Sequence, residues 1–179
     1  MKVQTLKIDR LTTERLILIP FTLQLCKDFI DDDFSELYKL GFKKGKSWPD
    51  IDVIETLPKI VNNLAQVESP TGFESWMIIK KDTLEIIGDL GFKGFNDESR
   101  SVDIGYGILK EERRNGYAKE AAVELIGWAL STEIVSKITA QCELDNLSSV
   151  NLLKKLNFIE MKRDDEMIYW SLQNKEYKE

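Results

Sequence analysis

The chain of 179 residues is 42% hydrophobic and 31% charged, and it contains no histidine. Without an imidazole, a Ser-His-Asp triad, a Cys-His pair and a histidine-ligated zinc site are excluded, and we predict no metal site. The formal net charge of -6 disfavours a nucleic-acid partner, and the length favours one domain over residues 1–179 with a core of its own.

The cysteines and the apolar runs of the sequence indicate the cellular compartment of the protein. Cys26 and Cys142 lie far apart in sequence, and we predict two buried thiols in a reducing compartment. The charge-free run from Leu16 to Cys26 is broken by Pro20 and is shorter than the ~20 residues that a membrane span needs. The start of the chain also lacks the apolar core of a signal peptide. We therefore predict a cytoplasmic protein without a membrane partner.

The first part of the chain is predicted to contain one strand followed by helices. Leu16–Ile19 is typical of a strand, and the segment Leu23–Leu40 is predicted to be helical with an acidic break at Asp31–Asp33. Residues 41–49 are predicted to form a loop. Apolar residues then recur at helical spacing from Ile51 to Val67, which indicates a further helix.

The second part of the chain alternates between strand and helix patterns. We predict strands over residues 76–79, 86–92, 101–109, 137–144, 158–163 and 167–172, and helices over residues 118–129 and 148–156. The first two strands are predicted to form a hairpin, as are the last two. The strand, helix and strand near the middle are what a parallel crossover requires, so the sequence predicts a mixed α/β fold.

The junction between the strand at 101–109 and the helix at 118–129 is the most informative segment. It has the sequence Arg113-Arg114-Asn115-Gly116-Tyr117-Ala118. A glycine and a small residue at the first turn of a helix allow an anion to approach the free backbone N–H groups, where the helix dipole also favours negative charge. An ordinary polar loop remains the alternative.

The same six residues match the pattern (Gln/Arg)-x-x-Gly-x-(Gly/Ala), and the chain thereby resembles the GNAT superfamily of acetyl-CoA-dependent N-acetyltransferases. Further matches resemble the branch of the Rim-type ribosomal-protein N-terminal acetyltransferases. They are Thr13-Glu14-Arg15-Leu16-Ile17-Leu18, Asp103-Ile104-Gly105-Tyr106, Asn146-Leu147-Ser148-Ser149 and Lys155-Leu156-Asn157-Phe158. The resemblance spans nearly the whole chain and is weakest from Asp31 to Gly72.

The resemblance implies a fold and a binding mode. The fold would be the GNAT fold, a mixed and mostly antiparallel sheet of seven strands flanked by helices, with the fourth and fifth strands parallel and splayed apart. The pantetheine arm of acetyl-CoA would lie between those two strands. The residues that bind acetyl-CoA would be Ile108, Leu109, Arg113, Arg114, Asn115, Gly116, Tyr117, Ala118, Asn146 and Asn151.

The resemblance also implies the reaction, in which a primary amine attacks acetyl-CoA directly. Asp103 would be the base, with Glu143 as its rival, although either carboxylate could be merely solvated or ion-paired. Ser149 would lie near the leaving thiolate, unless Ser148 or Ser149 only caps the short helix. The acceptor would be a protein N-terminal amine or a small amine, and the protein a monomer or a homodimer. The alternative is a non-catalytic module that binds CoA.

Two local features of the sequence carry further expectations. Asn157 stands where the resemblance leads us to expect glycine, and asparagine tolerates the left-handed backbone that glycine would adopt there. The aromatic residues Phe42, Trp48 and Phe73 lie in the part that forms the acceptor wall in relatives. They either line the acceptor cleft or pack in the core, and we favour the core.

Overall fold

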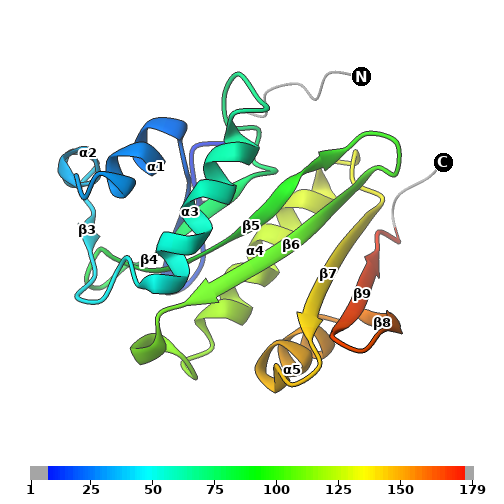
Figure 1. The fold of residues 1–179 in the computed structure, drawn as a ribbon. Coiled ribbons are helices and arrows are strands. Elements are labelled where there is room, and N and C mark those ends of the chain that lie inside the picture. The colour runs from blue at the N-terminus through cyan, green and yellow to red at the C-terminus, as the bar shows by residue number, and fades with distance from the viewer. Residues whose placement is uncertain (1–7, 176–179) are drawn as a thin grey trace.

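The computed structural model describes residues 8–175 (Figure 1). Its strands are β1 (Leu11–Thr12), β2 (Leu16–Pro20), β3 (Lys43–Lys44), β4 (Ser75–Lys80), β5 (Glu85–Asn96), β6 (Ser101–Ile108), β7 (Lys137–Glu143), β8 (Ile159–Arg163) and β9 (Met167–Gln173). Its helices are α1 (Leu23–Ile30), α2 (Ser35–Lys39), α3 (Ile51–Leu64), α4 (Tyr117–Ser131) and α5 (Leu147–Lys155), with a 3-10 turn over Lys110–Glu112.

The strands form a single mixed sheet. The strand order is β1-β2-β4-β5-β6-β7-β9-β8, and β3 pairs beside β5. The pairings are antiparallel except for β6–β7 and β3–β5, which are parallel. The predicted total of seven strands is too low by two, because β1 and β3 are two-residue pairings whose partners lie elsewhere in the sheet. Such short segments have no periodicity to detect, and β3 falls inside the predicted loop 41–49.

The parallel pair β6–β7 opens along its length. The two strands are in register from Ser101 opposite Lys137 to Asp103 opposite Thr139. Beyond that point β6 continues beside β5 as far as Ile108, whereas β7 continues beside β9. Figure 1 shows the two arrows diverging toward their carboxyl ends. This divergence confirms the predicted splay and places it at the end of β6 that leads into the Arg113–Ala118 segment.

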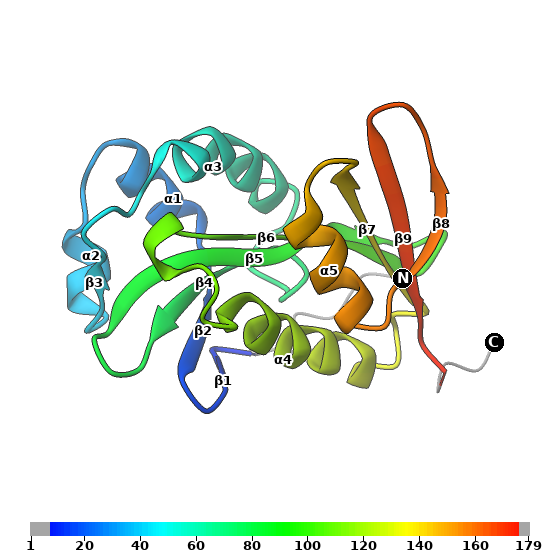
Figure 2. The ribbon, with the colours of Figure 1, turned by 90° about the horizontal axis from the view of Figure 1, so that it is seen from below.

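Each face of the sheet is covered by helices, α4 on one side and α1 and α3 on the other (Figure 2). Side chains alternate between the two faces of the sheet, so each face has its own hydrophobic core. Leu16 and Leu18 belong to the core with α4, and Met77 belongs to the core with α1 and α3. Val102 and Ile104 face α4, as the strand pattern predicts. The three aromatic residues weighed between the acceptor cleft and the core are buried core residues: Phe42, Trp48 and Phe73.

Local sequence signals set several chain reversals and helix ends. Asp50 caps α3, its Oδ1 accepting a hydrogen bond from Val53 N at 3.0 Å. α3 accommodates Pro58 and ends at Leu64, one turn earlier than predicted. Asn157 has φ 64°, which confirms the left-handed backbone expected where the resemblance calls for glycine.

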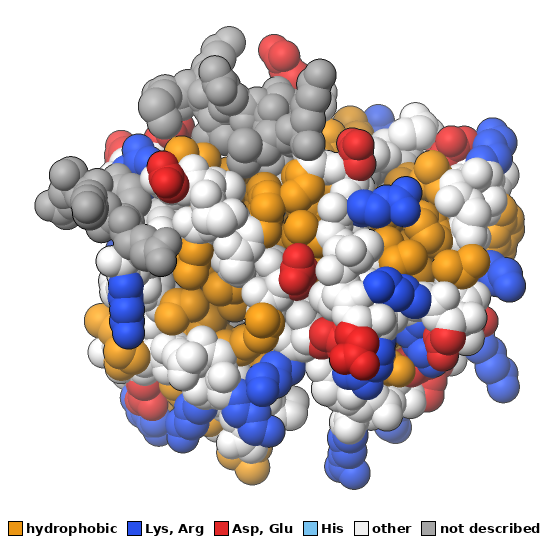
Figure 3. Space-filling model, turned by 180° about the vertical axis from the view of Figure 1, so that it is seen from behind, with side chains coloured by type: hydrophobic (Ala, Val, Ile, Leu, Met, Phe, Trp, Pro, Cys, Tyr) orange, Lys and Arg blue, Asp and Glu red, His pale blue; other side chains and the backbone are white. Residues whose placement is uncertain are grey.

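The surface carries charges of both signs, and the two thiols are buried. On the face seen in Figure 3, acidic and basic side chains are interspersed with separate hydrophobic patches. Cys26 and Cys142 are both free and buried, as predicted. No helix within residues 8–175 is long and apolar enough to cross a bilayer.

Candidate functional site

The segment between β6 and α4 presents unsatisfied backbone donors. Gly116 is the N-cap of α4, with φ 81° and ψ 4°, and it offers no side-chain cap. Arg114 also has a positive φ, 67°. The first intrahelical bond runs from Glu120 N to Gly116 O at 3.0 Å, so the amides of residues 117–119 precede the regular ladder. These free N–H groups at the positive end of a helix dipole form a site that favours an anion.

Arg113 and Asn115 hold this segment in place. The Arg113 Nε donates to the carbonyl oxygen of Ile108 at 2.8 Å, and its guanidinium lies 3.8 Å from the Asp52 carboxylate at the start of α3. The Asn115 amide donates to the carbonyl oxygen of Glu112 at 3.1 Å. The loop therefore keeps its shape through its own side chains, and Arg113 connects it to the helix on the opposite face of the sheet.

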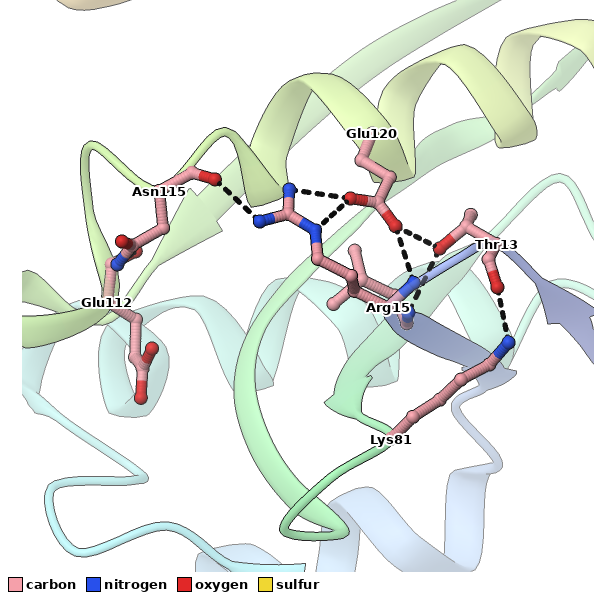
Figure 4. Close-up of polar contacts among 7 residues, drawn as sticks. Thr13, Arg15, Lys81, Glu112, Asn115 and Glu120 are labelled. Carbon is pink, nitrogen blue, oxygen red and sulfur yellow. Dashed lines mark hydrogen bonds and ion pairs between the residues drawn. The ribbon is translucent and has the colours of Figure 1, made fainter.

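Arg15 forms a second clamp on the loop, from the start of β2 (Figure 4). Its Nε donates to Glu120 Oε2 at 2.7 Å, and another guanidinium nitrogen donates to the carbonyl oxygen of Asn115 at 3.0 Å. The guanidinium carbon lies 4.6 Å from the centroid of the Tyr117 ring. One arginine thus contacts three residues at the entrance of α4. In the sequence, Thr13–Arg15 indicated only a resemblance, and this role of Arg15 was not predicted.

Glu120 is the other half of the clamp. Its carboxylate also accepts hydrogen bonds from Thr13 Oγ1 at 2.5 Å and from Arg15 N at 2.9 Å. Burial acts to raise the pKa of Glu120, but these hydrogen bonds outweigh it and hold the pKa below its usual range. Glu120 is therefore ionised and binds Thr13 and Arg15 as a carboxylate. Lys81 also holds this segment, because its Nζ donates to the carbonyl oxygen of Thr13.

A cavity of about 580 Å³ lies between α3 and the floor that β5 and β6 provide. Four of the residues predicted to bind acetyl-CoA line it: Ile108, Leu109, Arg113 and Asn146. Its volume is within the range of small-molecule sites. The other predicted contacts, Arg114 through Ala118, are not among the lining residues and lie in the loop and at the start of α4. The exposed Asn151 is on α5, also away from the lining.

Asp89 lies in the floor of this cavity, and the sequence reasoning missed it. It is paired in the sheet with Gly107. Burial, with a smaller contribution from the charge of Asp50, raises the pKa of Asp89 to about 7. None of the described residues forms a hydrogen bond or an ion pair with its carboxyl group. The available signal was one acidic residue inside the otherwise apolar and glycine-rich run 86–92.

The structure contradicts the alternative that Ser148 or Ser149 only caps α5. Asn146 caps this helix, its Oδ1 accepting from Ser149 N at 3.1 Å, so neither Ser148 nor Ser149 is the cap. The Ser149 side chain instead shares a hydrogen bond with Tyr106 of β6. Burial raises the pKa of Tyr106, the Ser149 bond opposing it, so the phenol remains protonated near neutral pH.

Asp103 and Glu143 lie outside the first cavity. Asp103 accepts a hydrogen bond from Thr139 Oγ1 at 2.9 Å and forms an ion pair with Lys93. It lines a second cavity of about 500 Å³ beside β8 and β9. Glu143 is exposed at the end of β7. Within the part of the chain that the structure describes, no group of three Cys, Asp or Glu residues is placed to hold a metal ion.

Known proteins are similar to this chain in sequence and in fold. The family model described as "Acetyltransferase (GNAT) domain" matches residues 15–159. Two uncharacterized N-acetyltransferases of Bacillus subtilis (strain 168) are similar. YjdG is 41% identical over 160 residues, covering 89% of this chain and 95% of that protein. YoaA is 30% identical over 152 residues, covering 83% and 81%.

Solved structures resemble the fold at low sequence identity. The ribosomal-protein-S5-alanine acetyltransferase from Vibrio fischeri aligns with a TM-score of 0.68 at 14% identity, covering 95% of this chain and 99% of that one. The microcin self immunity acetyltransferase MccE, solved in complex with acetyl-CoA and AMP, aligns with a TM-score of 0.61 at 13% identity, covering 90% and 93%.

Proposed function

The chain belongs to the GNAT acetyltransferase family, and from this premise we propose that it moves the acetyl group of acetyl-CoA to a primary amine by direct attack in a ternary complex. The observation that carries this proposal is the uncapped first turn of α4, with Gly116 at its N-cap, beside the point where β6 and β7 part. It combines an anion site with an opening between two strands.

Acetyl-CoA fits this part of the molecule as follows. Its pyrophosphate would accept hydrogen bonds from the backbone amides of residues 114–118, where Arg113 and Arg114 add positive charge. The pantetheine arm would pass between the diverging strands, beside Ile108 and Leu109. Asn146 and Asn151, at the start and on the exposed side of α5, would donate to that arm. Arg113 and Asn146 line the same cavity, which supports one continuous path.

The chemistry needs a neutral amine, a polarised thioester and a protonated leaving group. The amine nitrogen attacks the carbonyl carbon, the C–S bond breaks and the thiolate takes a proton. Asp103, or its rival Glu143, would remove the amine proton through a water molecule. Ser149 would assist the leaving sulfur, and its hydrogen bond with Tyr106 supports the phenol as the source of the proton.

The acceptor is proposed to be a protein N-terminal amine or a small amine. Structural similarity to a ribosomal-protein acetyltransferase supports the first, and the volume of the cavity is compatible with the second. Two free, buried thiols suit a reducing compartment, so we place the reaction in the cytoplasm. We propose no nucleic-acid partner, and a monomer or a homodimer.

Release of CoA tests the proposed function. Incubation with acetyl-CoA and a panel of primary amines is expected to produce free thiol, read with a thiol reagent, for at least one amine. Direct attack predicts that Cys142→Ala keeps kcat within about twofold of the wild type, because this thiol is buried and accepts a hydrogen bond from Trp170 Nε1 at 3.4 Å. Complete loss of turnover in Cys142→Ala would instead indicate an acyl-enzyme.

The same assay separates the proposal from its alternative. Binding of acetyl-CoA, measured by calorimetry, without thiol release to any amine would favour a non-catalytic module. Failure to bind acetyl-CoA would refute both.

Breaking the Arg15–Glu120 clamp is expected to change the KM for acetyl-CoA but not the KM for the amine. Glu120→Gln is expected to raise the KM for acetyl-CoA about fivefold, equivalent to about 1 kcal/mol, because the partly exposed pair is screened by solvent. The KM for the amine should stay unchanged, since the clamp holds the loop before α4. Steady-state kinetics with each substrate varied in turn measures both. Glu98→Gln, in the exposed β5–β6 turn, is the matched control, and an equal effect there would refute the clamp.

A further inference from the structure

We propose that Asp89 is the acceptor subsite of this enzyme: its carboxylate receives the primary ammonium group of the acceptor and, in place of Asp103 or Glu143, takes up the proton that the amine must lose. The inference rests on the proposed function and deepens it, because it assigns the group that the acceptor meets. The class of acceptor is an unhindered primary ammonium, supplied by a small amine or by a peptide N-terminus.

The cavity between α3 and β5–β6 connects Asp89 with the residues proposed for acetyl-CoA. Asp89 lies on the floor, and Arg113 and Asn146 line the same space of about 580 Å³. An amine that enters this cavity and reaches Asp89 is therefore in the compartment that also receives the acetyl end of the pantetheine arm. Asp103 lines the second cavity, and Lys93 and Thr139 already bind its carboxylate.

The floor around Asp89 is made of backbone. Gly107, its partner in the sheet, would place a Cβ 3.7 Å from Asp89 Oδ1. At Gly105 an added Cβ would meet no atom within 4 Å. Both glycines line the cavity, so side chains at these positions would extend into the space beside the carboxyl group. Their absence leaves Asp89 accessible to an ammonium group from above the sheet.

The other charged and titratable groups that face this cavity leave Asp89 without a partner. They are Asp50, Asp52 and Lys59 from α3, Lys93 from β5, the Tyr106 phenol from β6, and Arg113. Asp52 pairs with Arg113, Lys93 pairs with Asp103, and Asp50 caps α3. Asp89 alone among these carboxylates has no bonding partner in the described chain. A half-buried carboxylate of this kind is stabilised by a cation, which the ammonium group of the acceptor supplies.

The step balances without any other reactant. The ammonium group gives one proton to the Asp89 carboxylate, and the free amine attacks the thioester carbonyl carbon. The C–S bond breaks and the thiolate takes the Tyr106 proton. The attacking nitrogen loses its second proton as the amide forms, and this proton passes through water to the Tyr106 phenolate. Asp89 returns its own proton to solvent when the amide leaves. Burial raises the pKa of Asp89 to about 7, which suits a base that works near neutral pH.

The experiment measures kcat/KM for the amine from about pH 5 to pH 9 in the wild type and in Asp89→Asn. The wild-type rate is expected to rise with pH through about 7, because the carboxylate is the active form. Asp89→Asn should lower kcat/KM about 100-fold or more and remove that rise, with the affinity for acetyl-CoA unchanged. A linear diamine and a short peptide with a free N-terminus form two arms that identify the source of the ammonium.

Three further variants keep the result interpretable. Asp97→Asn, an exposed aspartate in the β5–β6 turn, should match the wild type, and Asp103→Asn tests the rival base named in the proposed function. Gly105→Ala inserts a methyl group into open space and should raise the KM for the amine but not that for acetyl-CoA. Because folding raises the pKa of Asp89, its ionisation costs stability as the pH rises, so Asp89→Asn should melt no lower than the wild type at about pH 8.

The outcomes are distinct. Turnover by the wild type together with unchanged kcat/KM and pH dependence in Asp89→Asn would overturn this inference alone. Loss of the pH-dependent rise in Asp103→Asn instead would assign the base to Asp103 and also overturn it. No release of CoA by the wild type to any amine would overturn the proposed function, and the inference with it.

Discussion

Gly116→Val is expected to weaken acetyl-CoA binding by more than about 100-fold, because two or more charge-assisted hydrogen bonds to the pyrophosphate would be lost. Gly116 has φ 81° at the N-cap of α4, and a β-branched residue there favours a different backbone conformation. That change would turn the free amides of the first helical turn away from the anion. Calorimetric titration with acetyl-CoA measures the affinity.

Gly94→Val separates this effect from backbone strain in general. Gly94 has φ 93°, and an added Cβ there would have no atom within 4 Å. At Gly116 an added Cβ would make only an ordinary contact, 3.6 Å from a guanidinium nitrogen of Arg15. Each valine is expected to cost about 1–2 kcal/mol of folding free energy, because both force a side chain into the left-handed region. Thermal unfolding should therefore show similar losses, while the binding defect is confined to Gly116→Val. Normal affinity in Gly116→Val would remove the anion-site argument.

The double variant Tyr106→Phe with Ser149→Ala is expected to lower kcat about 100-fold, because the leaving thiolate loses its proton source. The two side chains share a hydrogen bond, and burial holds the pKa of Tyr106 above its usual range. Either change alone should cost less than the pair, since the remaining hydroxyl group still donates to sulfur. The affinity for acetyl-CoA should change little.

Pre-steady-state release of CoA in single-turnover conditions reports this step. Tyr38→Phe removes the hydroxyl group of an exposed tyrosine on α2 and is the matched control. A double variant that releases CoA at the wild-type rate would show that water protonates the thiolate. A loss of acetyl-CoA affinity equal to the loss of kcat would assign the pair to binding.

Much of the fold was predictable from periodicity. The alternation over 101–109 and the helical stripe over 118–129 correspond to β6 and α4, and the order strand-helix-strand predicted their parallel crossover to β7. These elements are long enough for one face to be consistently apolar. The two-residue strands β1 and β3 were missed because two residues are too few to show an alternating pattern.

The anion site was predictable for a different reason. The loop before α4 is a local structure, built from consecutive residues around Gly116, so its sequence pattern contains most of its geometry. The left-handed Asn157 is local in the same sense. The choice of Asn146 over Ser148 or Ser149 as the cap of α5 depended on a shift of one or two residues, which sequence patterns do not resolve.

The acceptor side of the site depended on tertiary structure. Asp89 and Asp103 look alike in sequence, each a single carboxylate within a strand. Asp103 lies where β6 and β7 are still paired and meets Thr139 and Lys93, whereas Asp89 lies opposite Gly107, beyond the point where the strands part. Arg15 and Glu120 are 105 positions apart and meet because the sheet places β2 beside the entrance of α4. The sequence by itself determined the longer elements and the loop before α4, since both arise from neighbouring residues. The tertiary structure decided which carboxylates are free, because that depends on burial and on partners from distant strands.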